Sequence, residues 1–307
     1  MEGKNNLTTI FLLGFQNLQS YKYLLFCLLL LTFCVTICGN VLIITLVFYS
    51  KNLQSPMYFF LSQLALCDIL LSGDSLPNTL YVVLNEGGII SFPGCIIQYL
   101  FFVISECTEC LLLTVMSYDR YLAICNPLHY TSIMESGLCQ KLAIMSWLPG
   151  ITYSTISTLS ISTLHFCGLN TIDHFFCDLA PILQLSCSDV SFMYLEAQIL
   201  TVPAMVCPLL ITVVSYIYVV RAILKISSAS GRQKAFFTCS SHLTVVCIYY
   251  GTVMAAYMLP TSMQSVTMNK ILTMIYAVVT PSLNPIIYSL RNKDIWKALA
   301  LVLLQVT

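Results

Sequence analysis

Three carboxylic acids and one ion pair stand out in a chain that is otherwise strongly apolar. Glu106 and Glu109 are three residues apart, which places them on neighbouring faces of one helix. Asp68 falls at a comparable depth in the preceding apolar segment, and Asp119 is followed directly by Arg120. Ionisable groups inside apolar segments are costly, so by default they mark functional positions. Acids this close cannot all ionise in a low dielectric, and we expect at least one to be protonated or to share a bound cation.

Two interpretations of the three acids remain open, a working site and a passive hydrogen-bonded cluster. Catalytic chemistry has no support in the sequence. The chain has no His-Glu-x-x-His zinc motif, no Gly-x-Ser-x-Gly nucleophile turn and no phosphate-binding loop, and it contains only four His. We therefore expect that the protein is not an enzyme.

The composition places these residues in a membrane. The 307 residues include 13 basic and 13 acidic side chains, a charge density roughly one third that of soluble domains, and 58% of them are apolar. The zero net charge gives no indication of a nucleic-acid partner. A helix needs about 20 mostly apolar residues to cross the hydrocarbon core. Seven segments meet this length, at 24–48, 57–84, 95–124, 142–164, 197–220, 236–259 and 271–290.

These segments leave no room for a separate soluble domain. We therefore predict that residues 1–307 form one all-α domain, a bundle of seven transmembrane helices surrounded by membrane lipid. With the amino terminus outside, ten basic residues lie on the cytoplasmic side and three on the outer side, as the positive-inside rule requires. The same orientation places the glycosylation sequon at Asn6 outside the cell.

This topology predicts a multi-pass protein of the plasma membrane with an extracellular amino-terminal segment, residues 1–23. Residues 289–307 are then cytoplasmic and begin with a short amphipathic eighth helix on the inner membrane surface. Four cysteines fall on the oxidising side, and their spacing leaves three pairings open: Cys95, Cys167, Cys177 and Cys187. Two disulfide bonds would hold the long extracellular loop 165–196 over the mouth of the bundle, as a lid over a ligand pocket.

Longer motifs follow one another along almost the whole chain. They are residues 56–62 (PMYFFLS), 116–125 (MSYDRYLAIC), 127–130 (PLHY), 174–178 (HFFCD), 234–243 (KAFFTCSSHL) and 281–292 (PSLNPIIYSLRN). Together they resemble the rhodopsin-like G-protein-coupled receptors and, within them, the class II (tetrapod-type) odorant receptors. The resemblance implies disulfide bonds Cys95–Cys177 and Cys167–Cys187.

The resemblance also implies how the protein signals. The residues of activation and G-protein coupling would be Asp119, Arg120, Tyr121, Tyr216 and Tyr288. The partner would be the stimulatory heterotrimeric G protein of olfactory neurons, which raises cyclic AMP. The resemblance implies no cofactor apart from a structural sodium ion, for which Asp68 and Glu109 match the family's mid-membrane polar pair. We expect a shift of population between two bundle states, in which Arg120 leaves Asp119.

The same alignment predicts a ligand pocket between the outer halves of the third, fifth, sixth and seventh spans. Its mostly apolar lining suits a small, volatile organic ligand that is held largely by burial. The predicted ligand-binding residues are Phe102, Val103, Glu106, Cys107, Leu200, Ala204, Tyr250, Val253, Met254, Tyr257, Met274 and Ala277.

Glu106 departs from the family pattern, which usually has a small residue at this position. One interpretation is that the acid favours an amine ligand. The other is that a neutral acid forms hydrogen bonds within the Glu109 cluster. Both remain open at this point.

Other functions share part of the pattern. A receptor for a non-odour metabolite outside the nose would carry every motif and remains an alternative. A transporter or channel predicts a continuous polar path or paired half-helices, which the sequence does not suggest. A light-sensing opsin is excluded, because residues 271–290 contain no Lys that could hold retinal.

Overall fold

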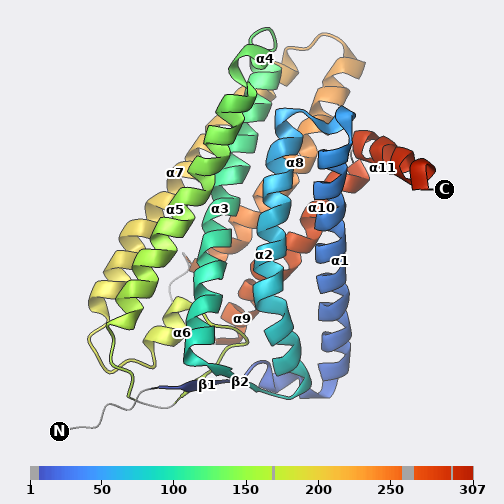
Figure 1. Ribbon diagram of the computed structural model, residues 1–307. Coiled ribbons are helices and arrows are strands. Elements are labelled where there is room, and N and C mark those ends of the chain that lie inside the picture. Colours follow the sequence, from blue (N-terminus) through green and yellow to red (C-terminus); the bar gives the residue numbers. More distant parts are fainter. Residues whose placement is uncertain (1–6, 168–169, 258–265, 292, 307) are drawn as a thin grey trace.

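The architecture is a bundle of long helices that run side by side (Figure 1). The computed structural model describes residues 7–167, 170–257, 266–291 and 293–306. Six of the described helical segments are long and apolar enough to cross a membrane, and α5, of 27 residues, packs among them against α3 and α7. The spans are α1 (Lys22–Tyr49), α2 (Pro56–Leu84), α3 (Phe92–Cys125), α5 (Ser136–Ser162), α7 (Ser191–Leu224), α8 (Ala229–Tyr257) and a seventh made of α9 (Val266–Met274), a π-helical turn (Ile275–Val279) and α10 (Thr280–Arg291).

Shorter helices join and flank the spans. They are α4 (Tyr130–Ile133), α6 (Leu179–Leu183), α11 (Lys293–Val306) and two 3-10 turns, Gln16–Tyr21 and Lys51–Leu53. Figure 1 shows α11 lying across the bundle axis at the end opposite β1 and β2. The predicted seven-helix bundle with a short eighth helix is therefore confirmed. Several spans exceed their predicted bounds: α3 and α7 each have 34 residues, about 51 Å of helix against roughly 30 Å of hydrocarbon.

The prediction of an all-α fold missed three short strands at the extracellular end. β1 (Thr9–Leu12) pairs antiparallel with β2 (Gly88–Ser91) and parallel with β3 (Thr171–Ile172). Each strand has only two to four residues, too few for an alternating pattern to stand out in the sequence. Residues 9–12, predicted only as part of an extracellular tail, thus form the central strand of a cap over the bundle. Asn6, the predicted glycosylation site, lies outside the described residues.

A proline in the seventh span explains how α1 and α10 pack. Pro285 has no N–H to donate to the carbonyl of Pro281, one turn earlier. Asn40 of α1 donates its Nδ2 to that carbonyl oxygen, at 3.4 Å. α1 comes this close because Gly39 has no side chain, and a Cβ there would lie 2.8 Å from Cβ of Pro285. The side chain of one helix thus satisfies a backbone group that the other leaves open, as the hydrocarbon core requires.

We expect Gly39→Ala to lower the thermal stability of the purified receptor, because the added Cβ forces α1 away from Pro285 and weakens the Asn40 hydrogen bond. Overpacking of this kind costs about 1–3 kcal/mol, a fall of several degrees in melting temperature. Gly73→Ala is the matched control, because a Cβ at Gly73 meets nothing within 4 Å and alanine favours a helix. Equal melting temperatures of the two variants would contradict this interpretation of the contact.

Candidate functional site

A cavity of about 150 Å³ lies in the outer half of the bundle, between α3, α5, α7 and α8. A cavity of this volume is large enough for a benzene-sized molecule. Its wall is mostly apolar and aromatic with a few polar groups, which is typical of a small-molecule site. The lining residues are Tyr99, Phe102, Val103, Glu106, Cys107, Cys110, Tyr153, Asp178, Leu179, Ala197, Thr201, Ala204, Met205, Tyr249 and Val253.

The cavity only partly coincides with the predicted pocket. Six predicted residues line it, namely Phe102, Val103, Glu106, Cys107, Ala204 and Val253. Five do not, namely Leu200, Tyr250, Met254, Met274 and Ala277. The side chain of Tyr257 lies outside the described residues.

Aromatic packing separates the cavity from the seventh span. The ring of Phe102 lies 5.1 Å from that of Phe176 and 6.0 Å from that of Tyr276, measured between centroids. Phe102 thus lies between the cavity and Tyr276 of the seventh span, and no residue of that span belongs to the described lining. The fourth span contributes instead, through Tyr153, whose hydroxyl lies 3.1 Å from Oγ1 of Thr201 on α7.

On α8, Val253 lines the cavity as predicted, but the tyrosine that lines it differs from the predicted one. Tyr249 lines the cavity, whereas the hydroxyl of Tyr250 lies 3.2 Å from Sγ of Cys110 and 3.4 Å from Oγ1 of Thr114. One residue along a helix turns the side chain by about 100°. Tyr99, also absent from the prediction, lies one turn before Phe102, and this helical spacing could have identified it.

Glu106 presents an unpaired oxygen at the cavity. The Tyr249 hydroxyl donates to the backbone oxygen of Glu106 at 2.8 Å and lies 3.4 Å from its Oε2. Oε1 is buried and has no hydrogen-bond partner among the described residues. The lining described above contains no Lys, Arg or His that could balance the charge of this acid.

The other two acids meet around Asn284 of α10, deep in the bundle. Asn284 Nδ2 lies 3.0 and 3.1 Å from the two carboxylate oxygens of Asp68 and 3.4 Å from Oε1 of Glu109. Both acids are fully buried. The described contacts include no hydrogen bond between Glu109 and Glu106, so Glu106 faces the cavity and Tyr249 while Glu109 belongs to a separate cluster.

At the cytoplasmic end, Asp119 is held by two partners. Arg120 forms a salt bridge to its Oδ2 through Nη2, with Nε at 3.0 Å, and the Tyr130 hydroxyl donates to its Oδ1 at 2.7 Å. The prediction included the ion pair but missed Tyr130, the last residue of the PLHY motif. We call these three residues the inner latch, and the structure holds it closed.

The remaining residues with a predicted role in activation lie around the inner latch without bonding to it. The hydroxyl of Tyr216 lies 2.6 Å from Nδ1 of His242, a buried residue that the prediction missed. The hydroxyl of Tyr288 is buried and has no hydrogen-bond partner among the described side chains. The ring of Tyr121 packs against Tyr218, with centroids 5.9 Å apart.

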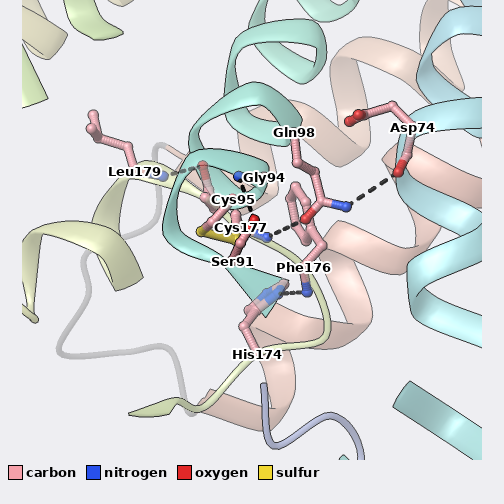
Figure 2. The surroundings of a disulfide bond; sticks show 10 residues. Asp74, Ser91, Gly94, Cys95, Gln98, His174, Phe176, Cys177 and Leu179 are labelled. Atoms are coloured by element: carbon pink, nitrogen blue, oxygen red, sulfur yellow. Dashed lines mark hydrogen bonds between the residues drawn. A yellow bond between two sulfur atoms is a disulfide. The ribbon is translucent and has the colours of Figure 1, made fainter. Parts of the chain in front are cut away.

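Both implied disulfide bonds form, which resolves the pairing that spacing left open. Cys95 is bonded to Cys177, with 5.4 Å between Cα atoms, and Cys167 to Cys187, with 5.8 Å. Figure 2 shows Gln98 beside the first bond, where its Nε2 donates to the backbone oxygen of Asp74 at 3.2 Å and its Oε1 accepts the N–H of Cys177 at 2.9 Å. The loop is therefore fixed to α3 by a covalent bond and a hydrogen bond.

A buried lysine joins the loop and the amino-terminal cap to the seventh span. Lys270 Nζ donates to the backbone oxygen of Gly14 at 2.7 Å and to Oδ1 of Asp173 at 2.5 Å. Burial, together with the nearby Lys270 charge, lowers the pKa of His174 to about 3, so this histidine is neutral at physiological pH. From the sequence, Lys270 is only one of the three basic residues expected on the outer side, because its partners are far away along the chain.

We expect Lys270→Met to loosen this cap. Loss of a charged hydrogen bond to a buried carbonyl costs about 1.5–3 kcal/mol, which would speed amide hydrogen exchange about 10- to 100-fold at Leu13 and Gly14. These amides donate to Ile172 and His174.

Lys22→Met is the matched control for this measurement, because Lys22 pairs with Glu86 at 2.5 Å on a more exposed surface. Unchanged exchange at Leu13 and Gly14 in Lys270→Met would show that the cap does not depend on the lysine.

Comparison with known proteins agrees with this geometry. A family profile described as "Olfactory receptor" matches residues 26–306. The human protein "Olfactory receptor 11L1" is 46% identical over 305 residues, which cover 99% of this chain and 95% of the relative. The mouse protein "Olfactory receptor 6B9" is 42% identical over 299 residues, which cover 97% of this chain and 95% of the relative.

A solved structure, "Crystal structure of squid rhodopsin", is similar in fold, with a TM-score of 0.75 and 16% identity. The match covers 92% of this chain and 80% of that one. At this identity the likeness concerns the fold alone, which is the seven-helix bundle. The sequence relatives add the family: the chain belongs to the olfactory receptors.

Proposed function

We propose that the protein binds a small organic odorant in the cavity between α3, α5, α7 and α8 and activates the stimulatory G protein of olfactory neurons, which raises cyclic AMP. Membership of the family makes it a signalling receptor of the plasma membrane rather than an enzyme, with odorants and a heterotrimeric G protein as partners. The observation that carries the proposal is that one helix, α3, lines the cavity with its outer half and carries the inner latch at its inner end.

The mechanism is a shift between two states of the bundle. An agonist that contacts Tyr249 and Val253 would favour an outward movement of the inner end of α8. Arg120 would then leave Asp119, and a cytoplasmic cavity would open for the G protein. A ligand can drive this change only if it binds the active state more tightly than the closed one.

Glu106 supports an amine as the ligand. Its Oε1 is buried without a partner, and an isolated polar oxygen in an apolar wall is costly unless something donates to it. An ammonium group would supply both the donor and the opposite charge. The alternative is that Glu106 is a neutral acid bonded within the Glu109 cluster. It is less well supported, because the hydrogen-bond partner of Glu109 is Asn284.

Asp68 and Glu109 fit a sodium ion. Asn284, whose Nδ2 lies beside both acids, has a buried Oδ1 with no hydrogen-bond partner among the described residues, and the same holds for Oδ1 of Asn40. Oxygen donors of this kind suit a hard cation. A bound sodium ion would supply positive charge that stabilises two carboxylates in a low dielectric.

We expect Tyr130→Phe to raise ligand-independent cyclic AMP, because Asp119 loses a hydrogen bond that helps to hold the inner latch closed. A hydrogen bond to a charged group is worth about 1.5–3 kcal/mol, so the equilibrium would shift about tenfold or more toward the active state. Arg120→Ala should have the opposite effect and abolish signalling. A reporter in cells that express the stimulatory G protein measures both, corrected for surface expression.

Tyr118→Phe is the matched control, since the described contacts include no hydrogen bond from the Tyr118 hydroxyl and its ring only stacks near Tyr121. Strong cyclic AMP production by surface-expressed Arg120→Ala would refute the role of the inner latch.

We expect Glu106→Gln to raise the half-maximal concentration of amine agonists about 10- to 100-fold, because the carboxylate that pairs with the ammonium is lost. Neutral odorants of the same carbon skeleton should change little. Cys107→Ser serves as control, because it alters the next lining residue without altering charge. Unchanged amine responses in Glu106→Gln would exclude the amine proposal.

A further inference from the structure

The cavity contains a second acid, from the opposite side. Asp178 lines the same space as Glu106 but comes from the extracellular loop, next to Cys177. The Cys95–Cys177 disulfide fixes Asp178 near the outer end of α3. Glu106 lies deeper along the same helix, 11 residues beyond Cys95. Both acids thus line one cavity, Asp178 from the loop and Glu106 from α3.

Each acid keeps one oxygen free for a ligand. Asp178 Oδ1 accepts the N–H of Leu179 at 2.7 Å, whereas the described contacts give no hydrogen bond to its Oδ2. Glu106 Oε2 lies near the Tyr249 hydroxyl, whereas its Oε1 is buried and unpaired. The Asp178 residue is only 8% exposed, so its second oxygen has little access to bulk water.

The charges of these two acids are not balanced by the cavity itself. No cationic side chain belongs to the lining within the described part of the chain, and the wall between the acids is formed by residues such as Val103, Met205 and Val253. Burial raises the pKa of Asp178 to about 6, in part offset by the Leu179 N–H, so its charge is costly in the ligand-free protein. A cation beside it would remove that cost.

We infer that Glu106 and Asp178 anchor the two ends of one ligand, and that the preferred agonists are small α,ω-diamines. One ammonium group pairs with each carboxylate, and the methylene chain lies along the apolar wall. This inference rests on the proposed function, which requires a small molecule in this cavity. It adds a specificity residue, Asp178, and a narrower ligand class than a single acid would select.

The test uses the full-length receptor with 1,5-diaminopentane and 1-aminopentane as probes, in the cyclic AMP reporter. Asp178→Asn should raise the half-maximal concentration of the diamine about 10- to 100-fold and that of the monoamine less than about threefold. Glu106→Gln should raise both. Asparagine keeps the hydrogen bond to the Leu179 N–H, so the fold of the loop is preserved. Asp189→Asn is the matched control, an exposed acid of the same loop that accepts the N–H of Ser191 at 2.9 Å.

Thermal stabilisation of the purified receptor by the diamine measures binding without a G protein. If the diamine stabilises the natural receptor but not Asp178→Asn, the result supports anchoring by both acids. If no cyclic AMP response accompanies that stabilisation, the proposed signalling is contradicted. If the diamine acts no better than the monoamine on the natural sequence, the inference that two acids anchor one ligand is wrong, whereas the proposed function is unaffected. The same inference is wrong if Asp178→Asn shifts the half-maximal concentrations of both probes equally, or if the diamine does not stabilise the purified receptor.

Discussion

The absence of water from the hydrocarbon core is the constraint on which the rest of this structure depends. Every backbone polar group inside the spans has to find its partner within the protein, and a buried polar side chain without a partner is costly. Pro285 leaves the Pro281 carbonyl without a donor, and Asn40 supplies one from another helix. Asn284 does the same for two buried acids. Such hydrogen bonds between distant segments determine which helices become neighbours, because each satisfies a group that lipid cannot.

The same constraint separates the polar residues into three regions. The cap and loop lie at the outer end, the Asp68–Glu109–Asn284 cluster lies in the middle, and the inner latch lies at the cytoplasmic end. α3 contributes to all three, through Cys95, Glu109 and Asp119. A helix is stiff over this length, so displacement at one region changes the packing at the others. In the proposed mechanism, this stiffness would let a ligand contact at Glu106 affect a salt bridge several turns away.

Much of the fold follows from the sequence, because uninterrupted apolar segments leave few alternatives to membrane helices. The orientation of side chains around each helix follows less well. α8 has apolar residues on all its faces, so hydrophobic periodicity could not distinguish Tyr249 from Tyr250. The cap was missed for a different reason: residues 9–12 pair with residues about 80 and 160 positions away. The structural roles of Lys270 and Tyr130 were not predicted for the same reason, since their partners become neighbours only after folding.

The cavity shows why the site depends on the loop as well as on the spans. Its inner acid is carried by a transmembrane helix, whereas its outer acid is carried by the loop that Cys95 and Gln98 tie to α3. The Phe102, Phe176 and Tyr276 rings close the side toward the seventh span. A ligand in this space would therefore contact both the transmembrane helices and the loop. Its binding would favour one state of the bundle only if the loop is held rigid against α3. A loose loop would move with the ligand instead of resisting it.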